Sequence, residues 1–390
     1  MGGIITPNLE IRDIIVEAGA EDAYKCFQCG KCMSLCPWYQ VETVLFPVYR
    51  IPQAVRLGIV TGSDDKDEIA KEVEEMFRCV GCEACTQRCP VGVSVPNVVR
   101  AIRRILVEYG TCPSELKAVV SKIYNVGNPL GEPRERRTNW AEGLNIPTYK
   151  SDMEFLYFPC CLSAYDSRGK EVARATAKLL KQANVSFGIL GTESCCCEAI
   201  RRVGAEKTFC EVAKSNIELF HSAGVRKILT TSPHCYSTLK TEYPELGADF
   251  EVVHHTQLLC RLLQEGKLVP EKSLPHKVVY HDPCTLGRHS GVYDEPREVL
   301  RSIPGLQLIE VENFCREYSV CCGAGGGGMW LDWPMDERIS NVRLEQVLAT
   351  GAELLAVACP YCLQMFEDTV KSMNLKLTVK DVSELLVESL

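Results

Sequence analysis

Cysteine is the residue type that suggests chemistry in this chain, both by its number and by its spacing. The sequence has 23 cysteines among 390 residues. Eight of them form two copies of the pattern C-x2-C-x2-C-x3-C-P, namely Cys26, Cys29, Cys32 and Cys36, then Cys79, Cys82, Cys85 and Cys89. This spacing lets one loop wrap three corners of a cube, as in proteins with two 4Fe-4S clusters. A pair of zinc sites is the alternative, but zinc sites prefer two separated CxxC pairs.

The spacing also predicts which thiols share a cluster. In two-cluster proteins with this motif, the fourth cysteine of each copy ligates the other cluster. We therefore assign one cubane to Cys26, Cys29, Cys32 and Cys89, and the second to Cys79, Cys82, Cys85 and Cys36. Pro37 and Pro90 then turn the chain away and supply no N–H.

A second duplication fills the chain beyond residue 150. Residues 216–239 align with residues 343–366 as a helix, a Gly-containing turn, an apolar run and a cysteine segment. Equivalent cysteines in the two copies are offset by 124 to 127 residues. Apolar runs that alternate with helical periods make each copy an α/β unit. The cysteines follow the strand ends, where loops converge in open sheets.

The second copy holds five cysteines on three separate segments, namely Cys284, the pair Cys321 and Cys322, and Cys359 with Cys362. The last two form a CxxC motif, which alone fits a redox dithiol, half of a zinc site or half of a cluster site. Five thiolates exceed the four that a cubane needs.

The order C, CCG, CxxC behind a two-cluster ferredoxin-type domain resembles the catalytic subunit of heterodisulfide reductase, over about residues 20–390. It is also similar to iron–sulfur subunits of glycerol-3-phosphate and lactate oxidation systems and of membrane-linked sulfite reduction complexes. The resemblance implies that the second copy holds a noncubane 4Fe-4S cluster, at which two irons bind and cleave a disulfide. The cysteines that it implies as both catalytic and cluster-binding are Cys284, Cys321, Cys322, Cys359 and Cys362.

Two features flank these cysteines. His281 and Asp282 precede Cys284, and His281 is a candidate catalytic residue because disulfide reduction consumes protons. The alternative is that His281 hydrogen-bonds loop carbonyls. The run GAGGGG after Cys322 lacks the Lys-Ser/Thr of a P-loop. We expect its glycines to let backbone and substrate approach the cluster where a Cβ would clash.

The first copy departs from this pattern. Its equivalent cysteines are Cys160, Cys195, Cys196 and Cys235, but Ser232 stands where the second copy has Cys359, and Cys197 replaces a glycine. Four thiolates suit structural zinc or an ordinary cluster, and Cys161 or Cys197 would restore a fifth ligand. We expect a non-catalytic metal there. The cysteines that fit no pattern, and that we expect to be buried small residues, are Cys112, Cys210, Cys260 and Cys315.

These patterns predict an α+β chain with a mostly helical two-cluster ferredoxin-like domain (1–112), a connector without sustained periodicity (113–150) and two tandem α/β CCG-domain repeats (151–270 and 271–390). Ser63 is the expected N-cap of a helix that leads into the second cysteine motif. Pro96 and Gly110 are expected near the start and the end of another helix.

Charge and hydropathy exclude other classes of protein. With 43 basic and 51 acidic residues the net charge is −8, which argues against a nucleic-acid binder that depends on phosphate contacts. The short basic cluster Pro133–Trp140 is expected to be a solvated linker or docking face. The chain opens without a signal-peptide pattern, and no apolar run reaches the ~18 residues of a membrane helix. We expect a cytoplasmic protein, peripheral to the membrane through a partner, whose cysteines bind metals rather than form disulfides.

The functional hypothesis is an iron–sulfur oxidoreductase subunit for anaerobic electron transport. A partner exchanges electrons with the two cubanes, which pass them to the noncubane cluster for disulfide or thiol redox chemistry. One alternative is an electron-transfer subunit that serves a separate flavin- or metal-dependent catalytic subunit, and a zinc-stapled scaffold is another. Since no dinucleotide fingerprint follows a strand, any flavin or nicotinamide belongs to a partner. We expect that partner to be another redox subunit, either flavin-containing or a membrane cytochrome.

Overall fold

The computed structural model describes residues 7–59 and 66–390. These residues form two compact units, each assembled from several stretches of the chain. The first unit consists of the residues up to Val120 together with Ala199–Thr208 and Gly323–Ile339. The second consists of Ser121–Glu198, Phe209–Cys322 and Ser340–Leu390.

The first unit is helical. Its elements are α1 (Leu9–Ile15), η1 (Val16–Ala20), η2 (Glu21–Lys25), η3 (Lys31–Leu35), η4 (Pro37–Gln40), α2 (Arg50–Leu57), α3 (Lys66–Phe77), α4 (Ala84–Arg88), α5 (Val95–Glu108), the start of α6 (Ser114–Val126), most of α9 (Glu198–Val203), η9 (Gly325–Trp330) and η10 (Met335–Glu337). Helix α5 begins where the Ser94 hydroxyl accepts a hydrogen bond from the Asn97 N–H, with Pro96 in the first turn. This confirms the helix expected near Pro96. Ser63, the expected N-cap ahead of α3, lies outside the described residues.

The stretch 113–150 contains more regular structure than its composition indicated. Helix α6 occupies Ser114–Val126 and buries Leu116, Val119 and Ile123, which lie three and four residues apart on one face. A shorter segment, η5 (Arg134–Ala141), follows. Three buried residues over two turns give too weak a pattern to stand out among the Pro, Gly and charged residues around it.

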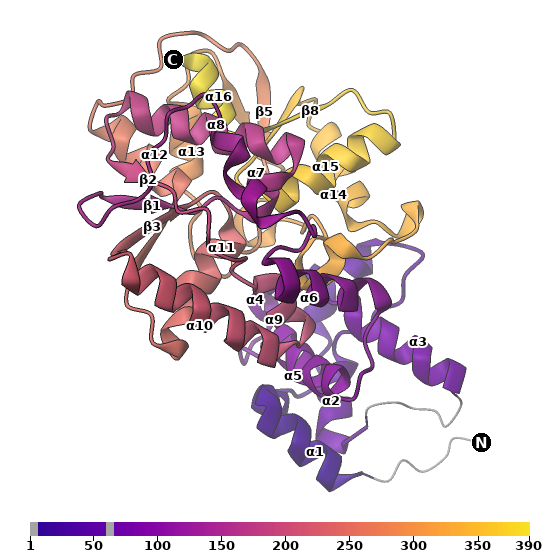
Figure 1. Cartoon of the computed structure of the whole chain (residues 1–390). Helices are drawn as coiled ribbons and strands as arrows, with labels where there is room; N and C mark the ends of the chain where they lie inside the picture. Colours follow the sequence, from indigo (N-terminus) through magenta and orange to yellow (C-terminus); the bar gives the residue numbers. More distant parts are fainter. Residues whose placement is uncertain (1–6, 60–65) are drawn as a thin grey trace. The chain divides into compact units, whose positions relative to one another are not determined.

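The second unit contains the two repeats, and each repeat forms a four-stranded parallel sheet (Figure 1). The first sheet has the order β2-β1-β3-β4, with β1 at Phe155–Tyr157, β2 at Phe187–Gly188, β3 at Lys227–Thr230 and β4 at Glu251–His254. The second has the order β6-β5-β7-β8, with β5 at Lys277–Tyr280, β6 at Gln307–Ile309, β7 at Leu354–Val357 and β8 at Thr378–Asp381. The repeated order and direction of the strands confirm the duplicated α/β fold and the α+β class.

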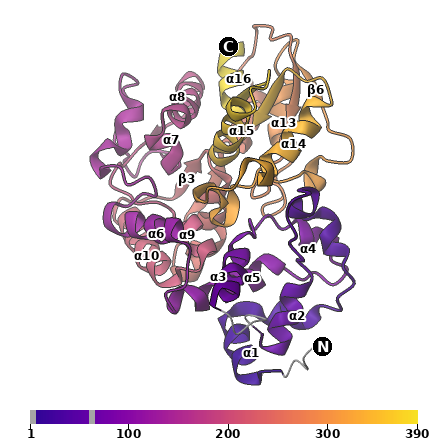
Figure 2. The same ribbon diagram turned by 90° about the vertical axis from the view of Figure 1, so that its right-hand side faces the viewer.

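Helices flank both sheets. Those of the first repeat are α7 (Cys161–Tyr165), α8 (Ser167–Gln182), α10 (Glu206–Ser222), α11 (Pro233–Ser237) and α12 (His255–Gln264). Those of the second are α13 (Glu295–Arg301), α14 (Ile339–Leu348), α15 (Pro360–Ser372) and α16 (Val382–Ser389), which Figure 2 shows around β6. The adjacent central strands β1 and β3, and likewise β5 and β7, are followed by Cys160, Cys235, Cys284 and Cys359. This is the edge of an open sheet at which loops meet.

Polar contacts join the two repeats within the second unit. Arg168 of α8 donates hydrogen bonds of 2.8 Å to both carboxylate oxygens of Glu384, and it also pairs with Glu367. The fully buried His255 ring lies 3.2 Å from the Asp381 carboxylate. The cysteine segments of both repeats therefore belong to one packed body.

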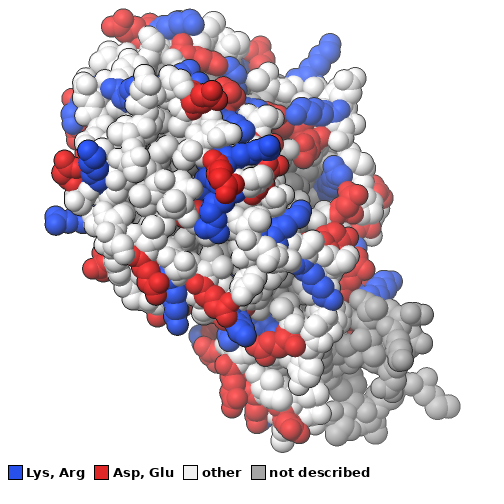
Figure 3. All heavy atoms as spheres, viewed as in Figure 1, with Lys and Arg blue, Asp and Glu red and all other residues white. Residues whose placement is uncertain are grey.

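The charge on the surface and the character of the helices can be compared with the sequence-based arguments against a nucleic-acid binder and against a membrane-spanning chain. In Figure 3 acidic and basic side chains are interspersed over the visible face, without a large area of one sign. Within residues 7–59 and 66–390, we find no helix with the length and apolar character that crossing a membrane requires.

Candidate metal centres

The eight cysteines of the first unit gather in two groups. The Cys32 thiol has the thiols of Cys26, Cys29 and Cys89 around it, and burial together with these neighbours raises its pKa to about 11. The Cys85 thiol has Cys82, Cys79 and Cys36 around it, and burial together with these neighbours raises its pKa well above the usual range. Each group combines three cysteines of one motif with the fourth cysteine of the other, which is the grouping that crossed ligation requires.

The two groups differ in their exposure. In the first group Cys29 is exposed and the other three cysteines are half-buried. In the second group all four cysteines are buried. A cluster held by the first group would lie near the surface of the unit, whereas one held by the second would be enclosed by protein.

A buried arginine holds the backbone beside the second group. The Arg103 guanidinium donates hydrogen bonds to the carbonyls of Cys79 at 2.7 Å, Met76 at 2.8 Å, Arg202 at 3.0 Å and Gly326 at 2.8 Å. At Gly326, which has a φ of +61°, an added Cβ would lie 2.3 Å from the Cys79 carbonyl oxygen. The glycine run therefore lets the backbone approach a cubane loop, and Gly326 does so four residues after Cys322.

The five cysteines of the second repeat converge. The sulfurs of Cys284 and Cys321 lie 3.7 Å apart, and the Cys362 thiol donates a 3.3 Å hydrogen bond to the Cys322 sulfur. Hydrogen bonds from Cys321 and then Cys362 lower the pKa of Cys322 well below its usual range. Burial opposes ionisation of Cys359, but hydrogen bonds from Cys362 and His234 lower its pKa to about 6. Two of the five thiols thus favour the thiolate form that binds metal.

His281 and Asp282 have different environments. One ring nitrogen of the fully buried His281 lies within 4.8 Å of the Cys322 and Cys362 sulfurs. Burial lowers the pKa of His281. Asp282 is bound by Arg297 through hydrogen bonds of 2.6 and 2.8 Å. His281 therefore stands beside the thiols, while Asp282 anchors the loop that precedes Cys284.

The first repeat also brings its cysteines together, and Cys161 joins them. The thiol of Cys161 hydrogen-bonds with that of Cys195, and the Cys235 thiol hydrogen-bonds with those of Cys160 and Cys196. The Arg137 guanidinium donates a 3.6 Å hydrogen bond to the Cys161 sulfur. The first repeat thus has a fifth thiol beside its four motif cysteines, although Ser232 occupies the position that Cys359 has in the second repeat.

The two residues that break the pattern in the first repeat have structural roles. The fully buried Ser232 is the N-cap of α11, and its hydroxyl accepts a hydrogen bond from the Cys235 N–H. Cys197 has a φ of +67°, where the second repeat has Gly323 with a φ of +92°. The Cys197 thiol donates to the Cys195 carbonyl at 3.2 Å.

The equivalent motif positions of the two repeats meet at His234 and Tyr361. Their rings pack with centroids 4.5 Å apart. His234 lies 3.2 Å from the Glu198 carboxylate and hydrogen-bonds with the Cys359 thiol. Burial opposes protonation of His234, but Glu198 and then Cys359 raise its pKa well above the usual range. A charged imidazole from the first repeat therefore contacts a thiol of the second.

The donor sets fit iron–sulfur clusters. Cluster iron takes thiolate ligands, and the structure offers two groups of four converging thiols and two groups of five. Comparison with known proteins agrees. The 4Fe-4S dicluster domain family matches residues 22–93, and the cysteine-rich CCG domain family matches residues 155–240 and 278–367. One subunit of the dihydromethanophenazine:CoB--CoM heterodisulfide reductase of Methanosarcina mazei is 31% identical over 99% of this chain and 98% of its own length. The chain belongs to the same family as this heterodisulfide reductase subunit.

Two longer proteins are also similar to this chain. The EtfAB:quinone oxidoreductase of Syntrophomonas wolfei is 34% identical over 94% of this chain and 58% of its own length. The probable iron-sulfur-binding oxidoreductase FadF of Bacillus subtilis is 35% identical over 94% of this chain and 60% of its own length. The chain therefore spans about three fifths of these relatives. What the chain shares with the whole family is a 4Fe-4S dicluster domain followed by two cysteine-rich CCG domains.

Several polar residues at these sites were not predicted from the sequence. His234 and Tyr361 flank motif cysteines, and their matched positions in SPHC and CPYC were a usable signal. Arg137 lies in the basic cluster Pro133–Trp140, but it is 1% exposed and pairs with Glu193 at 2.7 Å. The prediction of a solvated cluster was wrong for this residue, because charge runs do not reveal a buried counter-ion. Of the four unassigned cysteines, Cys260 is buried, and the other three are half-buried.

Proposed function

We propose that this subunit passes electrons through two 4Fe-4S cubanes to a noncubane 4Fe-4S cluster in the second repeat, where a disulfide is reduced or a dithiol oxidised. The cubane ligands are the two crossed groups of the first unit. The noncubane ligands are Cys284, Cys321, Cys322, Cys359 and Cys362. When bound, such a cluster supplies irons at which sulfur species can be held between two one-electron steps.

The observation that carries this proposal is the convergence of five thiols with unequal acidity in the second repeat. Cys322 and Cys359 have lowered pKa values, so they enter the site as thiolates. The charged His234 hydrogen-bonds with Cys359 and stabilises its negative charge, while His281 lies near the Cys322 sulfur.

The test is spectroscopic. The full chain is reconstituted anaerobically with iron and sulfide, and wild type is compared with Cys359→Ser and, as a control, with Cys260→Ser. We expect wild type to hold more iron than two cubanes contain, and to give a paramagnetic signal that changes when a thiol is added to the oxidised protein. Cys359→Ser should lose that iron and that signal but keep the cubane signals. Cubane-level iron in wild type would refute the noncubane site.

A second candidate is an electron-transfer subunit that serves another catalytic subunit. One observation favours it, since none of the five thiols of the second repeat is more than 7% exposed. Relatives that extend well beyond the span of this chain include one named for electron transfer from EtfAB to quinone. In this case a partner carries the flavin or quinone chemistry. Thiol-insensitive spectra together with full electron transfer to a partner subunit would favour it.

For the first repeat we propose a non-catalytic metal site on Cys160, Cys195, Cys196 and Cys235. Cys161 supplies a fifth thiol, because it hydrogen-bonds with Cys195 and accepts from Arg137. The redox partners of the whole assembly, a flavin-containing subunit or a membrane cytochrome, would keep this chain at the cytoplasmic side.

A further inference from the structure

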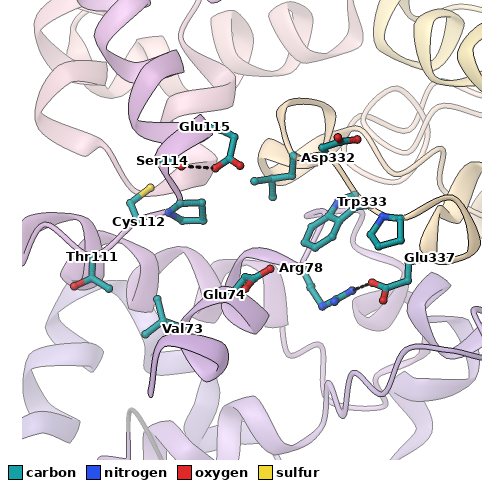
Figure 4. Close-up of a pocket in the computed structure, with 13 residues that line it drawn as sticks. Val73, Glu74, Arg78, Thr111, Cys112, Ser114, Glu115, Asp332, Trp333 and Glu337 are labelled. Atoms are coloured by element: carbon teal, nitrogen blue, oxygen red, sulfur yellow. Dashed lines mark hydrogen bonds and ion pairs between the residues drawn. The ribbon is translucent and has the colours of Figure 1, made fainter. Parts of the chain in front are cut away.

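A cavity of about 500 Å³ opens in the first unit, away from the cysteine groups themselves (Figure 4). Three segments line it: the end of α3 with Arg78, residues 111–115 before and within α6, and residues 331–337. Its volume lies within the range of sites that bind small organic molecules. Leu331 and Trp333 give it apolar surface.

One wall of this cavity is continuous with the ligand segments of the second cubane. Arg78 precedes Cys79 directly, and its carbonyl accepts a 2.6 Å hydrogen bond from the Trp38 indole N–H. Trp38 itself follows Cys36 by two residues and is 1% exposed. The Trp38 and Trp333 rings meet edge to face with centroids 5.7 Å apart. The aromatic wall thus connects the cavity with two of the four thiols assigned to this cubane.

The polar groups of the cavity define what it can hold. Arg78 is engaged by Glu337 at 2.7 Å and lies over the Trp333 ring at 4.7 Å. Figure 4 shows the carboxylates of Glu74, Glu115 and Asp332 around the opening. Burial raises the pKa of Cys112 to about 11, so its thiol adds no charge. Carboxylates outnumber cations, which disfavours a phosphate-bearing ligand.

Trp333 also offers aromatic surface to the cavity, because its side chain lines the cavity and is only half-buried. An aromatic ring that stacks on Trp333 would gain contact area. This favours a flat heteroaromatic or aromatic molecule.

We propose that this cavity binds a planar aromatic redox carrier that is uncharged or cationic, and that the bound carrier exchanges electrons with the second cubane through the Trp38–Trp333 wall. The proposal rests on the proposed function, because it needs the cubane in place. Each step moves one electron from the reduced carrier to the oxidised cubane, and any proton that the oxidised carrier releases passes to the solvent; the viologen radical cation releases none. This cubane thereby has an electron entry of its own, besides the exposed first group.

The experiment uses the full chain, reconstituted anaerobically and oxidised. Two planar donors of opposite charge are compared by rapid mixing, namely the methyl viologen radical cation and reduced anthraquinone-2,6-disulfonate. For wild type we expect the rate of cubane reduction to saturate with the viologen and to be slower with the disulfonate. The variants are Trp333→Ala, Trp333→Phe and the pair Glu115→Gln with Asp332→Asn. Tyr109→Ala and Glu108→Gln, which change exposed residues of the same unit, are the controls.

The half-saturating viologen concentration should rise roughly fivefold or more in Trp333→Ala. The same concentration should rise roughly two- to threefold in the double variant Glu115→Gln, Asp332→Asn. This variant should also react faster with the disulfonate. Trp333→Phe should keep most of the affinity, and neither control should change it. Oxidised methyl viologen should quench tryptophan fluorescence in wild type and less in Trp333→Ala, which reports binding without turnover.

Unchanged kinetics and unchanged quenching in Trp333→Ala, in protein whose cubanes are reduced normally by dithionite, would refute this inference alone. Protein that takes up no cubanes would refute the proposed function instead. The two failures are therefore distinguishable.

Discussion

The two cysteine-rich repeats share one strand order but differ in the ionisation of their thiols. In the second repeat Cys322 and Cys359 have lowered pKa values, because neighbouring thiols, and for Cys359 also His234, donate hydrogen bonds to them. Burial raises the pKa of Cys362. In the first repeat Cys161 and Cys235 have raised values, because they hydrogen-bond with Cys195 and Cys160 and are buried. A duplicated sheet therefore places the thiols, and the side chains around them decide which become thiolates.

Part of this difference in thiol ionisation arises because a residue of the first repeat contacts a thiol of the second. His234 belongs to the first repeat by sequence, yet its charged ring contacts Cys359. Its counterpart Tyr361 carries no such charge, and it lies near the thiols of Cys160 and Cys195. Divergence at one motif position has thus given the two halves unequal environments, which fits one working site and one supporting site.

The largest expected difference between the repeats is in turnover. Cys359→Ser should abolish disulfide-dependent oxidation of reduced benzyl viologen, because a hydroxyl is a poor ligand for cluster iron at neutral pH. Cys196→Ser should leave turnover substantial, and both variants should keep cubanes that dithionite reduces. Turnover is measured anaerobically with a panel of small disulfides. If Cys196→Ser lost turnover while Cys359→Ser kept it, the roles of the two repeats would be reversed.

A second contrast concerns the fifth thiol of the first repeat. Cys161→Ser should lower the metal content of that site, because its sulfur lies among the four proposed ligands and accepts from Arg137. Cys197→Ser should retain the metal, because its thiol is committed to the Cys195 carbonyl. Metal content per chain, measured by elemental analysis, checks both variants. Equal metal loss in the two would mean that Cys161 has no special role.

Each repeat also has a buried carboxylate that pairs with an arginine, and loss of the two arginines should cost different amounts of stability. Arg137→Met leaves the 3% exposed Glu193 without its partner and should cost about 3–5 kcal/mol in the free energy of unfolding. Arg297→Met should cost less, because Asp282 keeps a 2.7 Å hydrogen bond from the Arg316 N–H. Urea unfolding followed by tryptophan fluorescence measures both. Arg137→Met with Glu193→Met should recover most of the loss, and failure to do so would contradict the ion-pair explanation.

Much of the fold and of the cysteine sites could be predicted, because both depend on the spacing of residues along the sequence. The repeated C-x2-C-x2-C-x3-C-P motif predicts two cubanes, and the offset cysteines predict the two matching sheets. What could not be predicted depends on contacts between distant residues. Cys161 and Arg137 meet over 24 residues, and His234 meets Cys359 across 125 residues. Neither contact leaves a periodic signal.

The glycine run shows the same limit. We expected its glycines to admit backbone and substrate to the second-repeat cluster. The structure instead packs Gly326 on the Cys79 carbonyl, and Gly327 on Leu116 and Val203. The chemistry of glycine was predictable, since close approach needs a missing Cβ. The identity of the approaching segment depends on how the first unit folds.

The smallest expected effect concerns the residue after the paired cysteines. Gly323 and Cys197 both have positive φ values, of +92° and +67°, but only glycine adopts this conformation without strain. Gly323→Ala should therefore cost about 1–2 kcal/mol in the free energy of unfolding. Cys197→Gly should change stability by less, because relief of strain is offset by the lost hydrogen bond to Cys195 and by the greater freedom of glycine in the unfolded chain. Urea midpoints of the two variants against wild type measure the difference. A larger loss in Cys197→Gly than in Gly323→Ala would show that the Cys197 thiol contributes more to the first repeat than this single hydrogen bond.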